Sequence, residues 1–326
     1  MNNKKLVLSL FKLIGALLIV WALYIYINQL ILNWSKISAN QVQFNYIWGS
    51  LAILFVSLSY IWFTLAWQRA LNSFKETKDK INFFQCIGIY NSTQLAKYIP
   101  GKIWGYVLQT SVLKQFGINK STTVYLNILL SLLSVLYSLE LGLFFFAFYC
   151  GMSTFFGILI ILSLLSLILV YFYFSASEGL SKLLKRLAVI FKKEITIYKI
   201  DKASFLQINI IIFLSVIFFG LSGFASAMAI GTQFNSDLIL PISSAMAFAD
   251  AIGFLVLVAP GGIGVREVIL FAMLDVLGVG VTAVFIPVAA RLANMIADLL
   301  LGSVGFISLY HQKNKTSAKK NQKEYE

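Results

Sequence analysis

Long apolar runs, separated by short polar segments, dominate the chain. Several runs exceed the roughly 20 residues that a helix needs to cross the hydrocarbon core of a bilayer. They predict spanning helices at about Leu6–Ile27, Ile47–Trp67, Val124–Tyr149, Phe155–Phe174, Leu206–Ile230 and Val281–Leu309.

Two further apolar stretches, Ile81–Phe116 and Leu238–Gly278, are each interrupted by a Pro-Gly sequence. Proline removes a helix donor and glycine permits unusual backbone angles, so each interruption predicts a sharp bend. The pattern therefore predicts two hairpins, broken at Pro100-Gly101 and at Pro260-Gly261-Gly262.

The positive charges predict the orientation. Eight basic residues lie between Arg69 and Lys120, seven lie between Lys182 and Lys202, and five follow His311. Such residues concentrate in cytoplasmic loops. All these segments, and the N-terminal lysines, face the cytoplasm only if both hairpins are re-entrant. We therefore expect both termini in the cytoplasm and location in the inner (plasma) membrane.

This solution gives each half of the chain the order span, span, hairpin, span, starting on opposite sides of the membrane. The expected fold is an all-α polytopic membrane protein of about six spans and two re-entrant hairpins, in an inverted-topology repeat. The repeats cover about 1–149 and 150–310 of a single transmembrane domain, and 311–326 forms a basic tail without regular structure. Glu140 before Leu141-Gly142 and Asp298 before Leu301-Gly302 match between the halves, although chance similarity in apolar sequence can give such matches.

Composition agrees with a membrane protein. The chain has 326 residues, of which 59% are hydrophobic and 12% charged, where soluble domains are about a quarter charged. The net charge of +13 therefore reflects cytoplasmic loops rather than nucleic-acid binding. Cys86, Cys150 and His311 are the only cysteines and histidine, too few for a zinc or haem site, so we expect no metal and no cofactor.

Ionisable residues within apolar sequence are the first candidates for function, because burying each in a membrane costs roughly 2.5–3.5 kcal/mol. They are Glu140, Asp250, Arg266, Glu267, Asp275, Arg291 and Asp298. Arg291, Asn294 and Asp298 share one helix face. Two interpretations stay open: a stripe that offers Arg291 to an anionic headgroup, or an internal ion pair of Arg291 with Asp250 or Glu267. Asp250 and Glu140 are candidates for proton coupling or for structural hydrogen bonding.

The second break is the most specific motif. Gly261, Gly262 and Gly264 leave backbone amides unshielded just before a predicted helix, which begins near Arg266 and Glu267. Amides at a helix N-terminus attract anions. The motif predicts either an anion site or merely a tight turn. At the first break, Lys97 and Lys102 could guide a phosphate or could simply anchor the segment at the cytoplasmic surface.

The segments AKYIPGKIWGY, APGGIGVREVILFAML and ARLANMIADLLLG resemble the lysylphosphatidylglycerol synthase transmembrane region, also called the flippase-like domain family, over nearly the whole chain. The family includes the membrane half of the bacterial multiple peptide resistance factor. The resemblance implies substrate-binding roles for residues at both breaks and on the last span: Pro260, Gly261, Gly262, Gly264, Arg266, Glu267 and Arg291, with Pro100 and Gly101 matched more loosely.

From the resemblance and the topology we expect a bacterial translocase of a membrane phospholipid or polyprenyl-phosphate-linked intermediate in cell-envelope pathways. The chain ends 16 residues beyond Tyr310, so we expect no soluble aminoacyl-transferase domain and no synthase activity. The alternatives are a polyprenyl-linked glycosyltransferase, for which Asp237 is the one external carboxylate, and a non-transporting partner of a glycosyltransferase in a glycan-assembly complex.

Overall fold

The computed structural model describes residues 24, 26–32, 44–74, 80–98, 104–149, 200–233, 235–256, 262 and 264–324. In these residues the chain is helical, with short 3-10 turns and no strands. The architecture is therefore the all-helical one that the apolar runs predict.

Five described segments are long and apolar enough to cross a membrane: Tyr46–Asn72, Lys120–Phe145, Lys202–Ala229, Ser236–Leu255 and Thr282–Ile307. Four of them confirm predicted spans, and they belong to α2 (Tyr46–Asn72), α5 (Lys120–Tyr149), α8 (Lys202–Ala229) and α11 (Ile286–Glu324). The predicted span Phe155–Phe174, and all but the end of Leu6–Ile27, lie outside the described residues.

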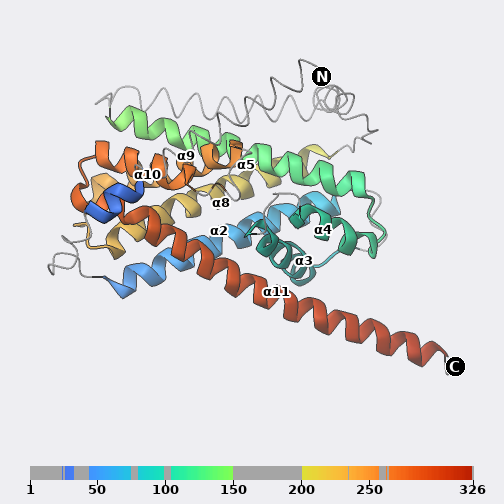
Figure 1. Ribbon diagram of the computed structural model, residues 1–326. Helices are drawn as coiled ribbons and strands as arrows, with labels where there is room; N and C mark the ends of the chain where they lie inside the picture. The colour runs from blue at the N-terminus through green and yellow to red at the C-terminus, as the bar shows by residue number, and fades with distance from the viewer. Residues whose placement is uncertain are drawn as a thin grey trace, which may run out of the picture. The chain divides into compact units, whose positions relative to one another are not determined.

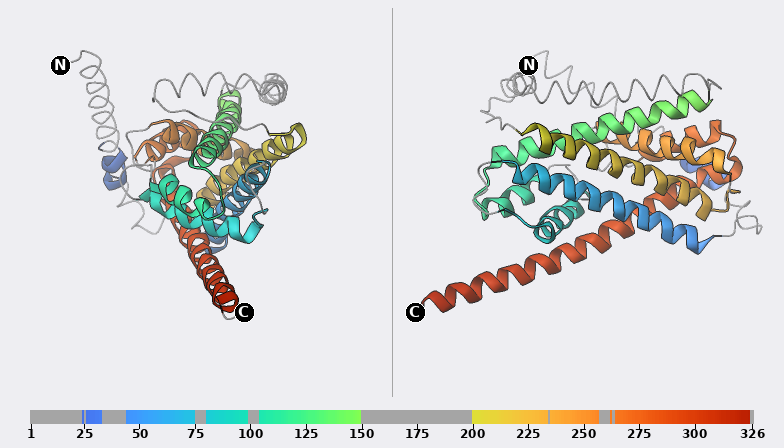
Figure 2. Two further views of the ribbon diagram at one scale, coloured as in Figure 1. Left: turned by 90° about the vertical axis from the view of Figure 1, so that its right-hand side faces the viewer. Right: turned by 180° about the vertical axis from the view of Figure 1, so that it is seen from behind.

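Each Pro-Gly stretch forms two helices that pack against each other (Figure 1). The first pair is α3 (Phe83–Gln94), which continues into a 3-10 turn at Leu95–Tyr98, and α4 (Trp104–Lys114). At about 1.5 Å per residue, both helices are too short to span about 30 Å. These two helices, both teal, also lie side by side in Figure 2.

The second pair is α9 (Ile239–Leu255) and α10 (Val265–Val276). With the turn before it, α9 is long and apolar enough to cross a membrane, whereas α10 is as short as the helices of the first pair. A full-length first arm was not expected for a re-entrant hairpin. Re-entry of both stretches therefore stays a prediction.

Polar residues in the flanking segments begin several of these helices. Asn82 accepts a hydrogen bond from the Gln85 N–H at 2.9 Å, and the Gln85 side chain accepts one from the Asn82 N–H at 2.9 Å. This reciprocal capping box satisfies two backbone donors at the start of α3. Asp201 caps α8 by accepting from the Ser204 N–H at 2.9 Å, and these hydrogen bonds hold the pKa of Asp201 below its usual value.

The chain divides into two compact units rather than into consecutive halves. The described residues of unit 1 come from 24–56, 135–149 and 216–296, and those of unit 2 come from 57–134, 200–215 and 297–324. The α9–α10 pair belongs to unit 1 and the α3–α4 pair to unit 2. Each of α2, α5, α8 and α11 contributes one end to each unit.

Glycines allow helices to approach closely within each unit. In unit 1, a Cβ on Gly220 of α8 would lie 2.8 Å from the Ser243 carbonyl oxygen of α9. In unit 2, a Cβ on Gly305 of α11 would lie 3.1 Å from the Gly88 carbonyl oxygen of α3. Small residues at such contacts are typical of membrane helix packing.

The last helix continues through the basic C-terminal segment. α11 ends at Glu324, so it includes most of 311–326, for which we expected no regular structure.

Candidate functional site

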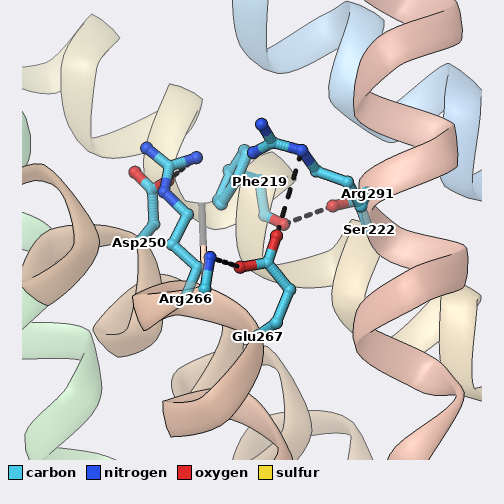
Figure 3. Close-up of polar contacts among 7 residues, drawn as sticks. Phe219, Ser222, Asp250, Arg266, Glu267 and Arg291 are labelled. Carbon is cyan, nitrogen blue, oxygen red and sulfur yellow. Dashed lines mark hydrogen bonds and ion pairs between the residues drawn. The ribbon is translucent and has the colours of Figure 1, made fainter. Parts of the chain in front are cut away.

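Two ion pairs connect three helices of unit 1 (Figure 3). Arg266, on the first turn of α10, places Nη1 2.6 Å from Asp250 Oδ1 of α9. Glu267, the next residue, places Oε1 3.9 Å from Arg291 Nε of α11. The structure therefore brings together two arginines and two carboxylates that the sequence had marked as candidates.

The four side chains are only partly exposed. The exposed fraction is 27% for Arg266 and 25% for Asp250, against 19% for Arg291 and 13% for Glu267. Their formal charges cancel, which is the condition under which ionised groups persist in an apolar surrounding. The internal pair between Arg291 and Glu267 is thus one of the two interpretations left open by the sequence.

Two glycines shape the path of the Arg266 side chain. A Cβ on Gly253 of α9 would collide with Arg266 Cγ, and a Cβ on Gly262 would lie 2.8 Å from Arg266 Nε. Gly262 also has φ +72°, a conformation that residues with a Cβ rarely adopt. The glycine-rich motif therefore makes room for the arginine as well as the turn.

Glu267 has a second partner. Its Oε2 accepts a hydrogen bond of 2.7 Å from the backbone N–H of Gly264, the residue before α10, which has φ +86°. A carboxylate at this position also interacts favourably with the positive end of the helix dipole. The Gly264 amide, which the anion-site interpretation leaves open to an external anion, is thus occupied by the carboxylate of the same motif.

A cavity of about 20 Å³ lies between α9, α10 and α11. It is lined by the four charged residues, by Asn294 and by apolar side chains, among them Phe219 and Pro287. A volume of this size holds about one water molecule. A whole lipid headgroup does not fit inside this volume.

Unit 1 has a second, larger hollow on another face of α11. Its volume is about 450 Å³, and most of the residues lining it are apolar, from α2, the end of α8 and the start of α11. Small residues, among them Gly49, Ala52 and Ala293, form part of its lining. It contains none of the predicted site residues.

The other predicted site residues lie elsewhere or are not described. Asp298 is buried two turns beyond Arg291, in the part of α11 that belongs to unit 2. Glu140 is buried in α5, and Lys97 lies in the 3-10 turn after α3. Outside the described residues are Pro100, Gly101, Lys102, Pro260 and Gly261.

Sequence reasoning did not identify Gly253 as part of this site. Its position three residues after Asp250, nearly one helical turn away, was an available signal. Without a fold, however, nothing indicated that the Arg266 side chain would cross α9 at that turn.

Comparison with curated proteins and with solved structures found no match. The family model described as "Lysylphosphatidylglycerol synthase TM region" matches residues 7–302. The match covers four of the five described spans in full and the fifth as far as residue 302, together with both Pro-Gly stretches and the charged site. The chain therefore belongs to the lysylphosphatidylglycerol synthase TM region family, whose members are membrane proteins in lipid-related processes.

Proposed function

We propose that the protein is a translocase that moves a lipid or lipid-linked intermediate with an anionic or zwitterionic headgroup between the leaflets of the inner membrane. The observation that carries the proposal is the set of two arginine–carboxylate pairs joining α9, α10 and α11. Ionised groups within membrane segments are costly and commonly mark substrate pathways.

The two pairs differ in a way that suits exchange of partners. Arg266 and Asp250 are in close contact at 2.6 Å, whereas Arg291 and Glu267 are 3.9 Å apart. Phosphate competes well for arginine because it accepts two parallel hydrogen bonds. In the proposed cycle, a headgroup phosphate takes Arg291 while Glu267 keeps its hydrogen bond to Gly264.

The described arrangement is a closed state of that cycle. The cavity beside the ion pairs has room for about one water molecule. Admission of a headgroup therefore requires that α9 and α10 separate from α11. In many transporters with repeated halves, one repeat or bundle of helices rocks or opens against the other around the site.

An inverted repeat with two re-entrant hairpins is part of the proposal. Pro100 and Pro260 have the same sequence separation as Gly142 and Gly302. Within unit 1, Gly142 of α5 contacts Phe248 of α9, and within unit 2, Gly302 of α11 contacts Leu95 beside α3. In each case a glycine of the span after one hairpin contacts the first arm of the other hairpin, a reciprocal arrangement that two repeats related by a two-fold axis would have.

The same register aligns Asp250 with Tyr90 and Arg266 with Tyr106. The first hairpin therefore has two uncharged tyrosines at the positions that form the ion pair in the second hairpin. This alignment supports a headgroup site at the second hairpin. The proposal also places both termini in the cytoplasm, because the basic loops predict that orientation.

Neutralising Arg291 alone, or Arg291 together with Glu267, tests whether this pair binds the lipid headgroup or only stabilises the fold. In liposomes with headgroup-labelled phosphatidylglycerol or polyprenyl phosphate, Arg291→Gln and the double variant Glu267→Gln/Arg291→Gln would be compared with wild type. The double variant leaves no uncompensated charge and keeps a side chain that can accept from Gly264. It should fold like wild type and still fail to move lipid, because the arginine is absent.

Arg69→Gln is the matched control, since Arg69 is an exposed arginine at the end of α2. It should move lipid at the wild-type rate. Recovery of transport in the double variant would instead mean that the pair is structural. Absence of transport by folded wild-type protein for every lipid tested would reject the translocase.

A further inference from the structure

The larger hollow of unit 1 lies within one leaflet of the membrane. Its walls are the start of α2, the end of α8 and residues 285–296 at the start of α11. These are the first part of the span Tyr46–Asn72, the end of the span Lys202–Ala229 and the first half of the span Thr282–Ile307. All three walls therefore lie at the same end of their spans, which the basic loops predict to be the outer one.

The length of this hollow matches one hydrocarbon chain. Between residues 285 and 296 the helix rises about 16 Å, which is about half of the roughly 30 Å of the hydrocarbon core. An acyl chain of a phospholipid covers the same half, because two such chains end to end make up that thickness.

The volume agrees with the length. At about 30 Å³ for each group of the size of a water molecule, the hollow of about 450 Å³ holds about fifteen such groups. A methylene group is of similar size, so the volume takes most of one acyl chain. A polyprenyl chain is several times longer and does not fit.

The walls favour hydrocarbon over water. Most of the residues lining the hollow are apolar, whereas a bound water needs two to four polar partners. The Ser226 hydroxyl, on the α8 wall, already donates to the Ser222 carbonyl oxygen of its own helix at 2.7 Å. A hollow with nothing in it would also leave its lining without dispersion contacts.

A chain can enter the hollow from the bilayer. Tyr46 of α2 and Val288, Leu292 and Ile296 of α11 line it, and all four side chains are exposed. The hollow is thus open along the apolar surface of the spans, where lipid chains lie.

We propose that this hollow binds one acyl chain of an outer-leaflet phospholipid. The chain contacts α2, α8 and α11 together and so stabilises their packing, and the protein keeps this lipid when the surrounding bilayer is removed. The site is separate from the ion pairs and does not depend on translocase activity.

A structure of the full chain in nanodiscs made of phospholipid tests the site directly. It should show continuous chain density in the hollow along residues 285–296. The exposed apolar face of α11 at Leu299, Phe306 and Ile307 is the internal control and should show no ordered chain. Density that continues into the protein itself, or a hollow without density, would overturn the proposal.

Retention of lipid in detergent tests the occupant. Full-length protein would be mixed with equal amounts of phosphatidylglycerol and polyprenyl phosphate, and native mass spectrometry would count the lipids bound. Wild type should retain one phospholipid. Ser50, an exposed residue that lines the hollow, offers a place to fill it. Ser50→Phe should raise the dissociation constant about tenfold or more, because the ring and the chain compete for the same space.

Ser303→Phe is the matched control, since Ser303 is an exposed serine of α11 outside the hollow, and it should bind like wild type. Ala289→Leu, also in the lining, replaces Ser50→Phe if that variant does not fold. Equal retention by wild type and by the folded variant that fills the hollow would overturn the site. Preference for polyprenyl phosphate would show that the occupant is not an acyl chain.

Discussion

Arg266 of α10 reaches Asp250 of α9 by passing between two glycines, and its Nη1 lies 2.6 Å from the Asp250 Oδ1. The contact joins the two arms of the second hairpin at the turn where Gly253 and Gly262 leave the backbone bare. The ion pair, the turn and the close helix packing thus involve the same few residues. Single substitutions can separate their contributions to stability.

Alanine at three glycines should distinguish packing from backbone strain. Gly262→Ala combines a clash with a positive φ, Gly253→Ala introduces the clash alone, and Gly278→Ala introduces only strain, because nothing lies within 4 Å of its Cβ position. We expect a loss of about 1–2 kcal/mol for the strain and about 1–3 kcal/mol for the clash. Thermal unfolding in detergent should rank Gly262→Ala as the least stable, and equal stability of the three would contradict the packing.

The Asp250–Arg266 pair should respond to single and double neutralisation unequally. Asp250→Asn leaves the arginine without its counter-charge, and we expect a cost of about 1–3 kcal/mol, below that of a fully buried pair because a quarter of each side chain is exposed. Asp250→Asn/Arg266→Gln should regain most of this stability. A double-mutant cycle on unfolding temperature measures the coupling, and additive effects would show that the pair contributes none.

Two close helix contacts predict different sensitivities to one added methyl group. Alanine at Gly220 would place its Cβ 2.8 Å from a backbone oxygen of α9, whereas at Gly305 the distance to a backbone oxygen of α3 is 3.1 Å. Backbone cannot yield as a side chain does, so Gly220→Ala should lower the unfolding temperature more than Gly305→Ala. The reverse order would mean that α9 shifts more readily than α3.

The start of α8 should lose protection in acid. Hydrogen bonds to Ser204 hold the pKa of Asp201 below its usual value, which is about 3.9 in unfolded chains. The carboxylate therefore stabilises this turn above about pH 4, and the contribution is lost as the pH falls through the depressed pKa. Amide exchange at the first turn should quicken over that range in wild type, while Asp201→Asn, which keeps a neutral cap, should show little change.

The sequence predicted four of the described spans because each is an apolar run long enough to cross a bilayer. It also marked Asp250, Arg266, Glu267 and Arg291, because charges are rare in such runs. It did not predict which carboxylate each arginine would meet, since pairing depends on how α9, α10 and α11 pack. Gly253 was not identified for the same reason. Which side chain packs against a glycine of an apolar helix depends on the fold.

The division into units was also beyond the sequence. Repeat matches such as Gly142 with Gly302 align consecutive halves, whereas the compact units exchange segments between those halves. Contacts of Gly302 with Leu95, and of Gly142 with Phe248, arise only once the chain has folded back. Apolar periodicity carries no information about such exchange, because every span presents similar residues to its neighbours.

The cancelling charges on α9, α10 and α11 bear on how membrane voltage acts on the protein. An elementary charge moved through the full membrane field exchanges about 2.3 kcal/mol with each 100 mV. Because two arginines and two carboxylates sum to zero, a joint displacement of the four through that field performs no net electrical work. In the proposed cycle, α9 and α10 instead carry Asp250, Arg266 and Glu267 away from Arg291. With two carboxylates and one arginine, the moving helices then have a net charge of −1 at this site, so an imposed potential would act on them as well as on an anionic lipid.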